Sequence, residues 1–424
     1  MAKIIFHFED GTQVEATAAI GENLLEVARK VNVAIDAPCS GNGSCGKCKV
    51  KFLKGELDSK ITRHMTEEEY KEGWRLSCIS TVTGDVEVLV PDIASAYKSR
   101  MKVADLSSPA EIRIFNKATE EIKAAGVEFK NSFDVFEVQM EAPTLDDTMP
   151  DNERLVWALE ALSGKSQIKL TFTVLRKMAK VLREASFHVK VVASVKGEEV
   201  YVYDILPADK DAFVAGVAID IGTTSVTGVV VDLLSGKILA KASTGNGQIR
   251  YGADVINRII EQQKPGGVEK LQKAIIEETL NPMIINMCRS AKLAPNCIYS
   301  MCVAANTTMN HLFAGVDGDP IRMEPFIPTF FGTDSIHGRD LGLKIHPDAR
   351  IIMAPNIGSY VGGDITAGAL VSMLWAQEPL SLFIDLGTNG EIVFGNADFM
   401  MSCACSAGPA FEGGDISCGM RATD

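Results

Sequence analysis

The sequence predicts a multidomain α/β protein, and three observations support this prediction. The chain has 424 residues, more than a single domain usually contains. Hydrophobic residues make up 46% and charged residues 23%, as in proteins that build ordinary cores. A cysteine-containing, glycine-rich loop lies among β-like segments near the N-terminus, and a strand–turn–strand pattern occurs twice further on. We expect a first domain at 1–94, a linker at 95–131, a small α/β module at 132–211 and a larger domain at 212–424.

The most informative feature of the first segment is a set of four cysteines. Cys39, Cys45, Cys48 and Cys78 are spaced C-x5-C-x2-C-x29-C. A [2Fe–2S] cluster is bound by a similar pattern, in which the first loop is one residue shorter. Zinc sites usually pair two C-x2-C units, and only one is present here, so a zinc site and purely structural cysteines are the weaker alternatives. The spacing therefore predicts that these cysteines hold a [2Fe–2S] cluster.

The segments around these cysteines predict a small mixed sheet with one helix. An amphipathic pattern predicts a helix at Asn23–Val31, because its apolar residues recur on one face. The predicted strands are Lys3–Glu9, Thr12–Ala16, Cys48–Phe52 and Asp85–Val90. Along its whole length, the segment 1–94 resembles a β-grasp [2Fe–2S] ferredoxin.

The next two segments offer little chemistry. A charge-rich linker with a predicted helix at Ser108–Ala125 suits a tethered domain that must reach a partner. The module that follows alternates strands and helices, predicted at Val135–Met140, Asp151–Leu162 (capped by Asp151), Thr171–Ala185, Phe187–Ser194 and Glu198–Leu206. His188 lies in one of these strands, where a structural role is favoured over that of a ligand.

The fourth segment contains an internal duplication. Residues 216–232 and 381–395 each show a strand, an Asp-[Ile/Leu]-Gly-Thr turn and a second strand. Two such copies in matching contexts favour a duplicated domain over two ordinary glycine-containing hairpins.

The repeated turn has the residues of a phosphate site. Backbone N–H groups and the hydroxyls of Thr223 and Thr224 suit an anion, and Gly222 lets the backbone approach it closely. Asp220, where the strand ends, can hold Mg²⁺ through water or orient an attacking water. The second copy offers an equivalent corner formed by Asp385, Gly387, Thr388 and Asn389. We therefore expect Asp220 and Asp385 to be catalytic and the other residues to bind the cofactor.

Three further segments have features of a nucleotide site. Asn306 and Thr307 stand where a predicted strand meets a helix, a position that suits anions. Gly363 and Asp364 precede a helix predicted at Ile365–Trp375. A glycine-rich turn later in the chain adds Gly408 and Glu412. Two opposed phosphate hairpins on duplicated ribonuclease-H-like subdomains resemble the ATPase superfamily of sugar kinases, acetate kinase and actin.

The combination of both parts resembles the reductive activators of corrinoid proteins. The matching stretches are PCSGNGSCGKCKV, AIDIGTTSVTG, YGADVINRI, NTTMNHLFAG, VGGDITAGAL, FIDLGTNGEIV and SAGPAFEGGDISCGM. The resemblance implies an enzyme that uses ATP with Mg²⁺ to pass one electron from its [2Fe–2S] cluster to cobalt, from Co(II) to Co(I). It implies as partners a low-potential electron donor and either a corrinoid iron–sulfur protein or a corrinoid methyltransferase component. Relatives continue well beyond the last turn, so we expect an incomplete second ATPase half.

Composition excludes some classes of protein. The net charge of −13 argues against sequence-independent nucleic-acid binding, which requires a basic face. The sequence lacks a long apolar run and a signal-peptide core, so we expect a cytoplasmic protein without a membrane span. A homodimer is left open.

Three other functions are weaker. The activators of 2-hydroxyacyl-CoA dehydratases lack a ferredoxin domain, and a small-molecule kinase needs no cluster. An electron-transfer or redox module with a degenerate ATPase half is the main alternative from another class of function.

Overall fold

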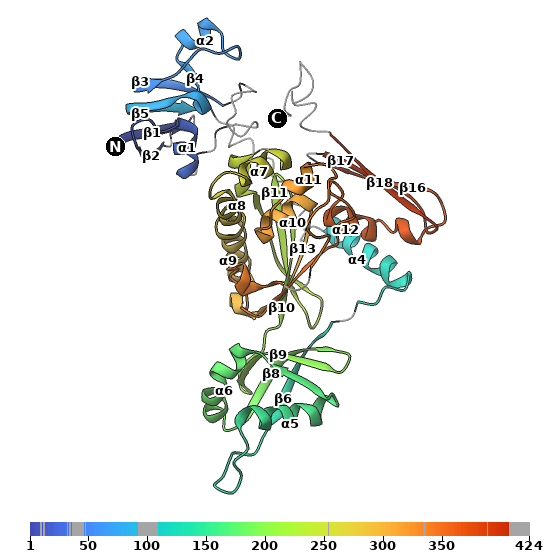
Figure 1. Ribbon diagram of the computed structural model, residues 1–424. Coiled ribbons are helices and arrows are strands. Elements are labelled where there is room, and N and C mark those ends of the chain that lie inside the picture. The colour runs from blue at the N-terminus through green and yellow to red at the C-terminus, as the bar shows by residue number, and fades with distance from the viewer. Residues whose placement is uncertain are drawn as a thin grey trace.

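The computed structural model describes residues 1–8, 11, 13–31, 33, 35, 46, 48–91, 109–129, 131–252, 254–333, 336–387 and 389–406. Figure 1 shows the N-terminal domain near α7 of the large domain and the middle module at the opposite end of that domain. No helix in these ranges is both long enough and apolar enough to cross a bilayer.

The N-terminal domain is a mixed five-stranded sheet with the strand order β2-β1-β5-β3-β4. Its strands are β1 (Ala2–Phe8), β2 (Gln13–Ala18), β3 (Lys49–Asp58), β4 (Trp74–Leu76) and β5 (Thr81–Val90), and its helical segments are α1 (Leu24–Lys30), α2 (Glu67–Lys71) and η1 (Ser77–Ile79). Helix α1 begins after Asn23, whose side chain accepts hydrogen bonds from the backbone N–H groups of Leu25 and Glu26. Leu24, Leu25 and Ala28 are buried in the core of the domain, so the predicted apolar face is confirmed.

The linker helix and the middle module follow. Helix α4 (Pro109–Ala124) contacts helix α12 (Gly363–Val371) of the large domain. The module has the strand order β6-β8-β9-β7. Its elements are β6 (Phe133–Gln139), α5 (Asp151–Ser163), β7 (Gln167–Leu170), α6 (Phe172–Glu184), β8 (His188–Lys196) and β9 (Glu199–Pro207). Strand β7 was not predicted.

The structure shows the contacts of Asp151 and His188, the two residues of the module for which a role was predicted. The expectation that Asp151 caps α5 is wrong, because Pro150 is the capping residue and the Asp151 carboxylate accepts a hydrogen bond from Arg183 Nη1 at 2.6 Å. His188 contacts Glu137 across the sheet, with 2.8 Å between Nε2 and Oε1, which fits a structural role.

The first lobe of the large domain is a six-stranded sheet with the order β12-β11-β10-β13-β15-β14. Strand β10 is antiparallel to β11 and parallel to β13, which is the mixed pattern expected of a ribonuclease-H-like lobe. The strands are β10 (Ala215–Ile221), β11 (Ser225–Asp232), β12 (Ile238–Gly245), β13 (Ile298–Ala305), β14 (Ile336–His337) and β15 (Arg350–Met353). The helical segments that matter below are η2 (Gly247–Tyr251), α7 (Val255–Gln262), α8 (Gly267–Ile275), α9 (Asn281–Ser290), α10 (Thr307–Ala314) and α11 (Asp319–Arg322).

The second lobe is smaller. It contains α12 and an antiparallel sheet of β16 (Ser381–Leu386), β17 (Asn389–Gly395) and β18 (Met400–Ser406). The expected helix 365–375 is wrong at its C-terminal end, because α12 ends at Val371 and Met373 has a φ of +60°. A non-glycine residue in this left-handed region cannot continue a right-handed helix. A short 3₁₀ turn, η6 (Leu374–Ala376), follows.

An aromatic cluster joins the middle module to the first lobe. Tyr203 of the module lies 5.9 Å from Tyr299 between ring centroids, and Tyr299 lies 5.0 Å from His346. The Tyr299 hydroxyl donates a hydrogen bond to Asp204 at 3.1 Å. Because these rings are buried and pack on one another, the module is firmly attached to the large domain.

The buried imidazole in this cluster makes the fold sensitive to acid. Burial, with a smaller contribution from Lys177, lowers the pKa of His346 to about 4. An unfolded histidine takes up its proton near pH 6.5, so the unfolded state binds more protons and stability falls between about pH 6.5 and pH 4. At pH 5 the loss is about 2 kcal/mol. Urea unfolding at pH 7.5 and pH 5 should show a smaller acid-induced loss in His346→Gln than in the unaltered protein, and equal losses would contradict this origin.

Candidate functional site

Two of the four predicted cluster ligands lie beside each other at one end of the N-terminal sheet. Strands β3 and β4 pair in a register that places Lys49 opposite Leu76, and the Ser77 N–H donates to the Cys48 carbonyl at 2.9 Å. Cys48 and Cys78 therefore flank the same end of this strand pair. Cys48 is buried and Cys78 is half-buried.

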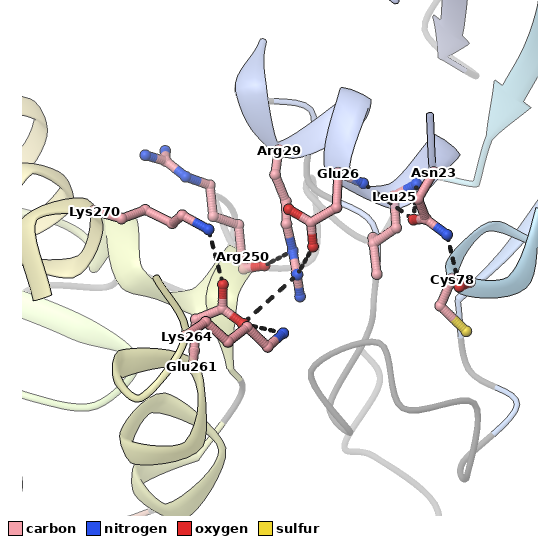
Figure 2. A network of polar contacts seen from close by, with 9 residues as sticks. All are labelled: Asn23, Leu25, Glu26, Arg29, Cys78, Arg250, Glu261, Lys264 and Lys270. Carbon is pink, nitrogen blue, oxygen red and sulfur yellow. Dashed lines mark hydrogen bonds and ion pairs between the residues drawn. The ribbon is translucent and has the colours of Figure 1, made fainter. Parts of the chain in front are cut away.

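The backbone near these cysteines is shaped by close contacts. Asn23 Nδ2 donates to the Cys78 carbonyl at 2.8 Å, which fixes the fourth ligand position to the start of α1 (Figure 2). Gly46 has a φ of +68°, and a Cβ there would lie 2.5 Å from His64 Cβ. A side chain at position 46 is therefore excluded, because the backbone there packs closely against His64. Cys39 and Cys45 lie outside the described residues.

The first phosphate hairpin is braced from two sides. Asn246 Nδ2 donates to the Gly222 carbonyl at 2.8 Å, and the Asn246 N–H donates to the Thr224 carbonyl at 2.9 Å. On the other side, the fully buried guanidinium of Arg258 donates to the Thr223 carbonyl. A Cβ on Gly222 would lie 2.6 Å from the Ser225 carbonyl oxygen, so only glycine fits this turn without movement.

The structure brings the predicted Asn306 to this hairpin. Asn306 Nδ2 donates to Thr223 Oγ1 at 3.1 Å, while its Oδ1 accepts from Met309 N and caps α10. Thr307 is fully buried, and its hydroxyl donates to the Gly358 carbonyl at 2.6 Å. The start of α10 is thus placed at the Thr223 turn, with Asn306 as the contact between them.

Helix α12 reaches the same place from the second lobe. A Cβ on Gly362 would lie 2.3 Å from Asn306 Cα, so the two backbones are in close contact. The Gly363 N–H donates to Asn356 Oδ1 at 2.9 Å, which holds the first turn of α12 in position. Asp364 follows in that turn. Gly222, Thr223, Asn306 and Gly363 therefore belong to one contiguous region.

Carboxylates from both lobes act on one another in this region. Crowding by protein atoms, followed by the charges of Asp364 and Asp385, raises the pKa of Asp220 to about 6. Asp220 is an exposed residue, and the negative charges of Asp364 and Asp385 disfavour its ionised form. Burial, and then the charge of Asp385, raises the pKa of Asp364.

Sequence reasoning missed one member of this group, Glu391. It lies opposite Asp385 in the β16–β17 register. Burial, then the charges of Asp364 and Asp385, raises its pKa to about 7. The signal that could have found it is its position, since it is the cross-strand partner of the aspartate that ends the first strand of the hairpin.

Negative groups that repel one another favour a bound cation. In the described parts of the chain, no three His, Cys, Asp or Glu side chains approach closely enough to hold a metal by themselves. Mg²⁺ usually keeps several waters and is held by one or two carboxylates together with substrate phosphates. The arrangement therefore fits Mg²⁺ that arrives with a phosphate ligand.

The remaining predicted residues lie at the tip of the first turn, in the second hairpin or outside the described residues. Thr224 is exposed at the tip of the first turn. In the second hairpin the Gly387 N–H donates to the Asn389 carbonyl at 2.9 Å, which closes the turn. Thr388, Gly408 and Glu412 lie outside the described residues.

Comparison with family models divides the chain into four parts. Residues 7–83 match the 2Fe-2S iron-sulfur cluster binding domain, and residues 122–212 match the RACo linker region. Residues 215–377 match the RACo middle region, and residues 379–424 match the C-terminal domain of RACo, the ASKHA domain.

Individual relatives agree with this division. The corrinoid activation enzyme RamQ of Eubacterium limosum is 38% identical over 224 residues, which are 52% of this chain and 37% of RamQ. A solved structure of a reductive activator for corrinoid, iron-sulfur protein covers all of this chain with 33% identity and a TM-score of 0.59, and 66% of that protein is covered. A subunit of the Na⁺-translocating NADH-quinone reductase of Mannheimia succiniciproducens is 37% identical over 78 residues, which are 18% of this chain and 19% of that protein. The chain therefore spans only part of each relative's length: 66% of the solved reductive activator, 37% of RamQ and 19% of the reductase subunit.

The two hairpins differ in how tightly they are packed, which gives a matched test. Gly222→Ala forces a methyl group against the Ser225 carbonyl, whereas at Gly387 the nearest atom to a new Cβ is 3.9 Å away. We expect Gly222→Ala to cost about 1–3 kcal/mol of stability. Gly387→Ala should stay within about 0.5 kcal/mol. Differential scanning calorimetry measures both, and similar losses would show that the first turn is not constrained as described.

Proposed function

We propose that this chain, which belongs to the family of reductive activators of corrinoid proteins, passes one electron to the cobalt of a corrinoid protein and uses ATP to do so. The observation that carries the proposal is the presence of two sites on one chain. A cysteine corner lies at the end of a ferredoxin sheet, and a two-lobed phosphate region contains mutually repelling carboxylates. A plain ferredoxin has no use for the second site, and a kinase has no use for the first.

In the proposal, the N-terminal domain holds its cofactor through Cys39, Cys45, Cys48 and Cys78. When bound there, a [2Fe–2S] cluster supplies a one-electron carrier of low potential. The protein contributes a rigid frame, because Asn23 fixes the Cys78 carbonyl and the β3–β4 register fixes Cys48. Hydrogen bonds and burial around the ligands tune the potential.

Residues of both lobes would bind the phosphates of the nucleotide and its Mg²⁺. Thr223 Oγ1 accepts from Asn306, so its own proton is left to donate to a phosphate oxygen. Asp220 and Asp385 would bind Mg²⁺ through water and orient an attacking water, with Asp364 and Glu391 adding negative charge nearby. Gly222, Thr224, Gly363, Gly387, Thr388 and Asn389 would shape the phosphate turns, and Thr307, Gly408 and Glu412 complete the proposed set.

ATP has a thermodynamic purpose in this scheme. Each 59 mV of unfavourable potential difference lowers the equilibrium constant of a one-electron transfer about tenfold. A nucleotide can offset such a difference only by binding one conformation of the complex more tightly than another. The proposed role of the phosphate region is therefore to favour a docked state in which cobalt is easier to reduce.

The finer parts of the proposal concern partners and location. We propose a corrinoid iron–sulfur protein or a corrinoid methyltransferase component as acceptor, a low-potential protein as donor, and a cytoplasmic location. The alternative is an electron-transfer module with a degenerate ATPase half. The first hairpin supports the activator, because the bracing contacts of Asn246, Arg258 and Asn306 all converge on it.

The cluster assignment predicts a defined metal content. Protein purified without oxygen should contain two irons and two acid-labile sulfides per chain and, once reduced, give a rhombic S = 1/2 signal in electron paramagnetic resonance. Cys78→Ser should lose or destabilise the cluster, because one of four thiolates is missing. Cys403→Ser, an exposed cysteine on β18, is the matched control and should keep it. Zinc, or four irons per chain, would refute the assignment.

The proposed function predicts that the cluster can be reduced without ATP, whereas the reduction of cobalt requires ATP. With ATP and a low-potential reductant, the intact protein should convert Co(II) of the corrinoid partner to Co(I), followed by visible absorption. Asp220→Ala should still accept an electron but lose the ATP-dependent cobalt step. Asp232→Ala removes an aspartate at the far end of the same hairpin and should behave normally. Cobalt reduction that proceeds equally well without ATP, or in Asp220→Ala, would contradict the proposed function.

A further inference from the structure

The N-terminal domain touches the large domain through a buried arginine. Arg29, near the end of α1, is only 3% exposed, although it belongs to a small domain's surface helix. Charged side chains are rarely buried unless they are paired. Figure 2 shows the Arg29 side chain extending from α1 towards η2 and α7 of the large domain.

The contacts of Arg29 cross between the two domains. Its Nε donates to the Arg250 carbonyl of η2 at 2.9 Å. Its Nη1 lies 4.0 Å from Glu261 Oε2 of α7, and within its own domain it donates to Glu26 at 2.7 Å. Its guanidinium also lies 5.9 Å from the centre of the Tyr251 ring. We call Arg29, Arg250 and Glu261 the interdomain clamp.

Each charge of the clamp has a second partner inside its own domain. Glu261 is fully buried and lies 2.6 Å from Lys264 Nζ and 3.0 Å from Lys270 Nζ. Arg29 keeps Glu26 when it leaves. Opening the clamp therefore strands no unpaired buried charge on either side, which removes the penalty that makes most buried ion pairs hard to separate.

The clamp lies between the two functional sites. At the other end of α1, Asn23 holds the Cys78 carbonyl, and this helix of seven residues is about 10 Å long. On the other side, α7 also carries Arg258, which donates to the Thr223 carbonyl of the phosphate hairpin. One short helix thus runs from the clamp to a cluster ligand, and another runs from the clamp to the nucleotide turn.

We propose that the interdomain clamp is a detachable latch that docks the ferredoxin domain on the large domain, and that nucleotide bound at the Thr223 hairpin shifts its opening through Arg258 and α7. The second half of this proposal rests on the nucleotide site proposed above, whereas the first half does not. A docked domain keeps its cluster end at a fixed place, and a released one is able to meet a donor or an acceptor.

The latch is tested by small-angle X-ray scattering of the intact, cluster-loaded protein. Arg29→Ala should increase the radius of gyration, because the ferredoxin domain is released. Lys30→Ala is the matched control: it removes the neighbouring positive charge of the same helix, whose ion pair with Glu22 stays within the domain. Unchanged dimensions of Arg29→Ala, or equal expansion of Lys30→Ala, would overturn the latch.

The nucleotide link is tested by calorimetric titration with a non-hydrolysable ATP analogue and Mg²⁺. Because coupling is reciprocal, Arg29→Ala should change the affinity for the analogue by at least about fivefold, and Lys30→Ala should not. Equal affinities of Arg29→Ala and the unaltered protein would overturn the link. If no variant binds the analogue, the proposed nucleotide site fails and the link fails with it, while the scattering result still decides the latch.

Discussion

The buried guanidinium of Arg258 makes the contact on which the Thr223 hairpin depends. It is fully buried and reaches the Gly252 carbonyl at 2.9 Å as well as the carbonyl of Thr223. One rigid group therefore fixes the hairpin turn relative to α7 and to the chain that precedes it. Since arginine keeps its charge in proteins, it cannot relieve the cost of burial by losing a proton and must be satisfied by acceptors. The hydrogen bond from Arg258 thus holds the turn in place, and Asn306 at the start of α10 makes a second hydrogen bond to it.

The second constraint on this region is the repulsion between its carboxylates. Asp220, Asp364 and Glu391 come from different strands and helices, and their pKa values are raised by burial and by the charges of neighbouring carboxylates, Asp385 among them. Such an arrangement is unfavourable for the protein alone, because like charges in a crowded region repel. A divalent cation and its phosphate ligand reverse that repulsion. In the proposed nucleotide site, the same charges that repel one another would favour a bound Mg²⁺ together with its phosphate ligand.

Local chemistry explains which features could be predicted from the sequence. Both hairpins and the capping position of Asn306 follow from short patterns of glycine, threonine and asparagine, and the structure has all of them. Arg29 could not be predicted in the same way, because its role depends on which elements pack together, whereas Glu391 follows only once the register of its hairpin is known. Strand β7 was missed because it has only four residues and gains its partner from distant β9. The early end of α12 arises from one left-handed residue, Met373, which has no clear sequence signal.

The two neighbours of the large domain are attached by interfaces of different kinds, and this difference supports the proposed release of the ferredoxin domain. The middle module is joined by the packed rings of Tyr203, Tyr299 and His346, whose apolar surface would have to be exposed to water on separation. The ferredoxin domain is joined at the clamp by Arg29, which keeps a partner on each side. Separating the rings would expose apolar surface to water, whereas each charge of the clamp keeps a partner within its own domain. In the proposed function the ferredoxin domain has to meet both a donor and an acceptor, and the second kind of interface suits that requirement.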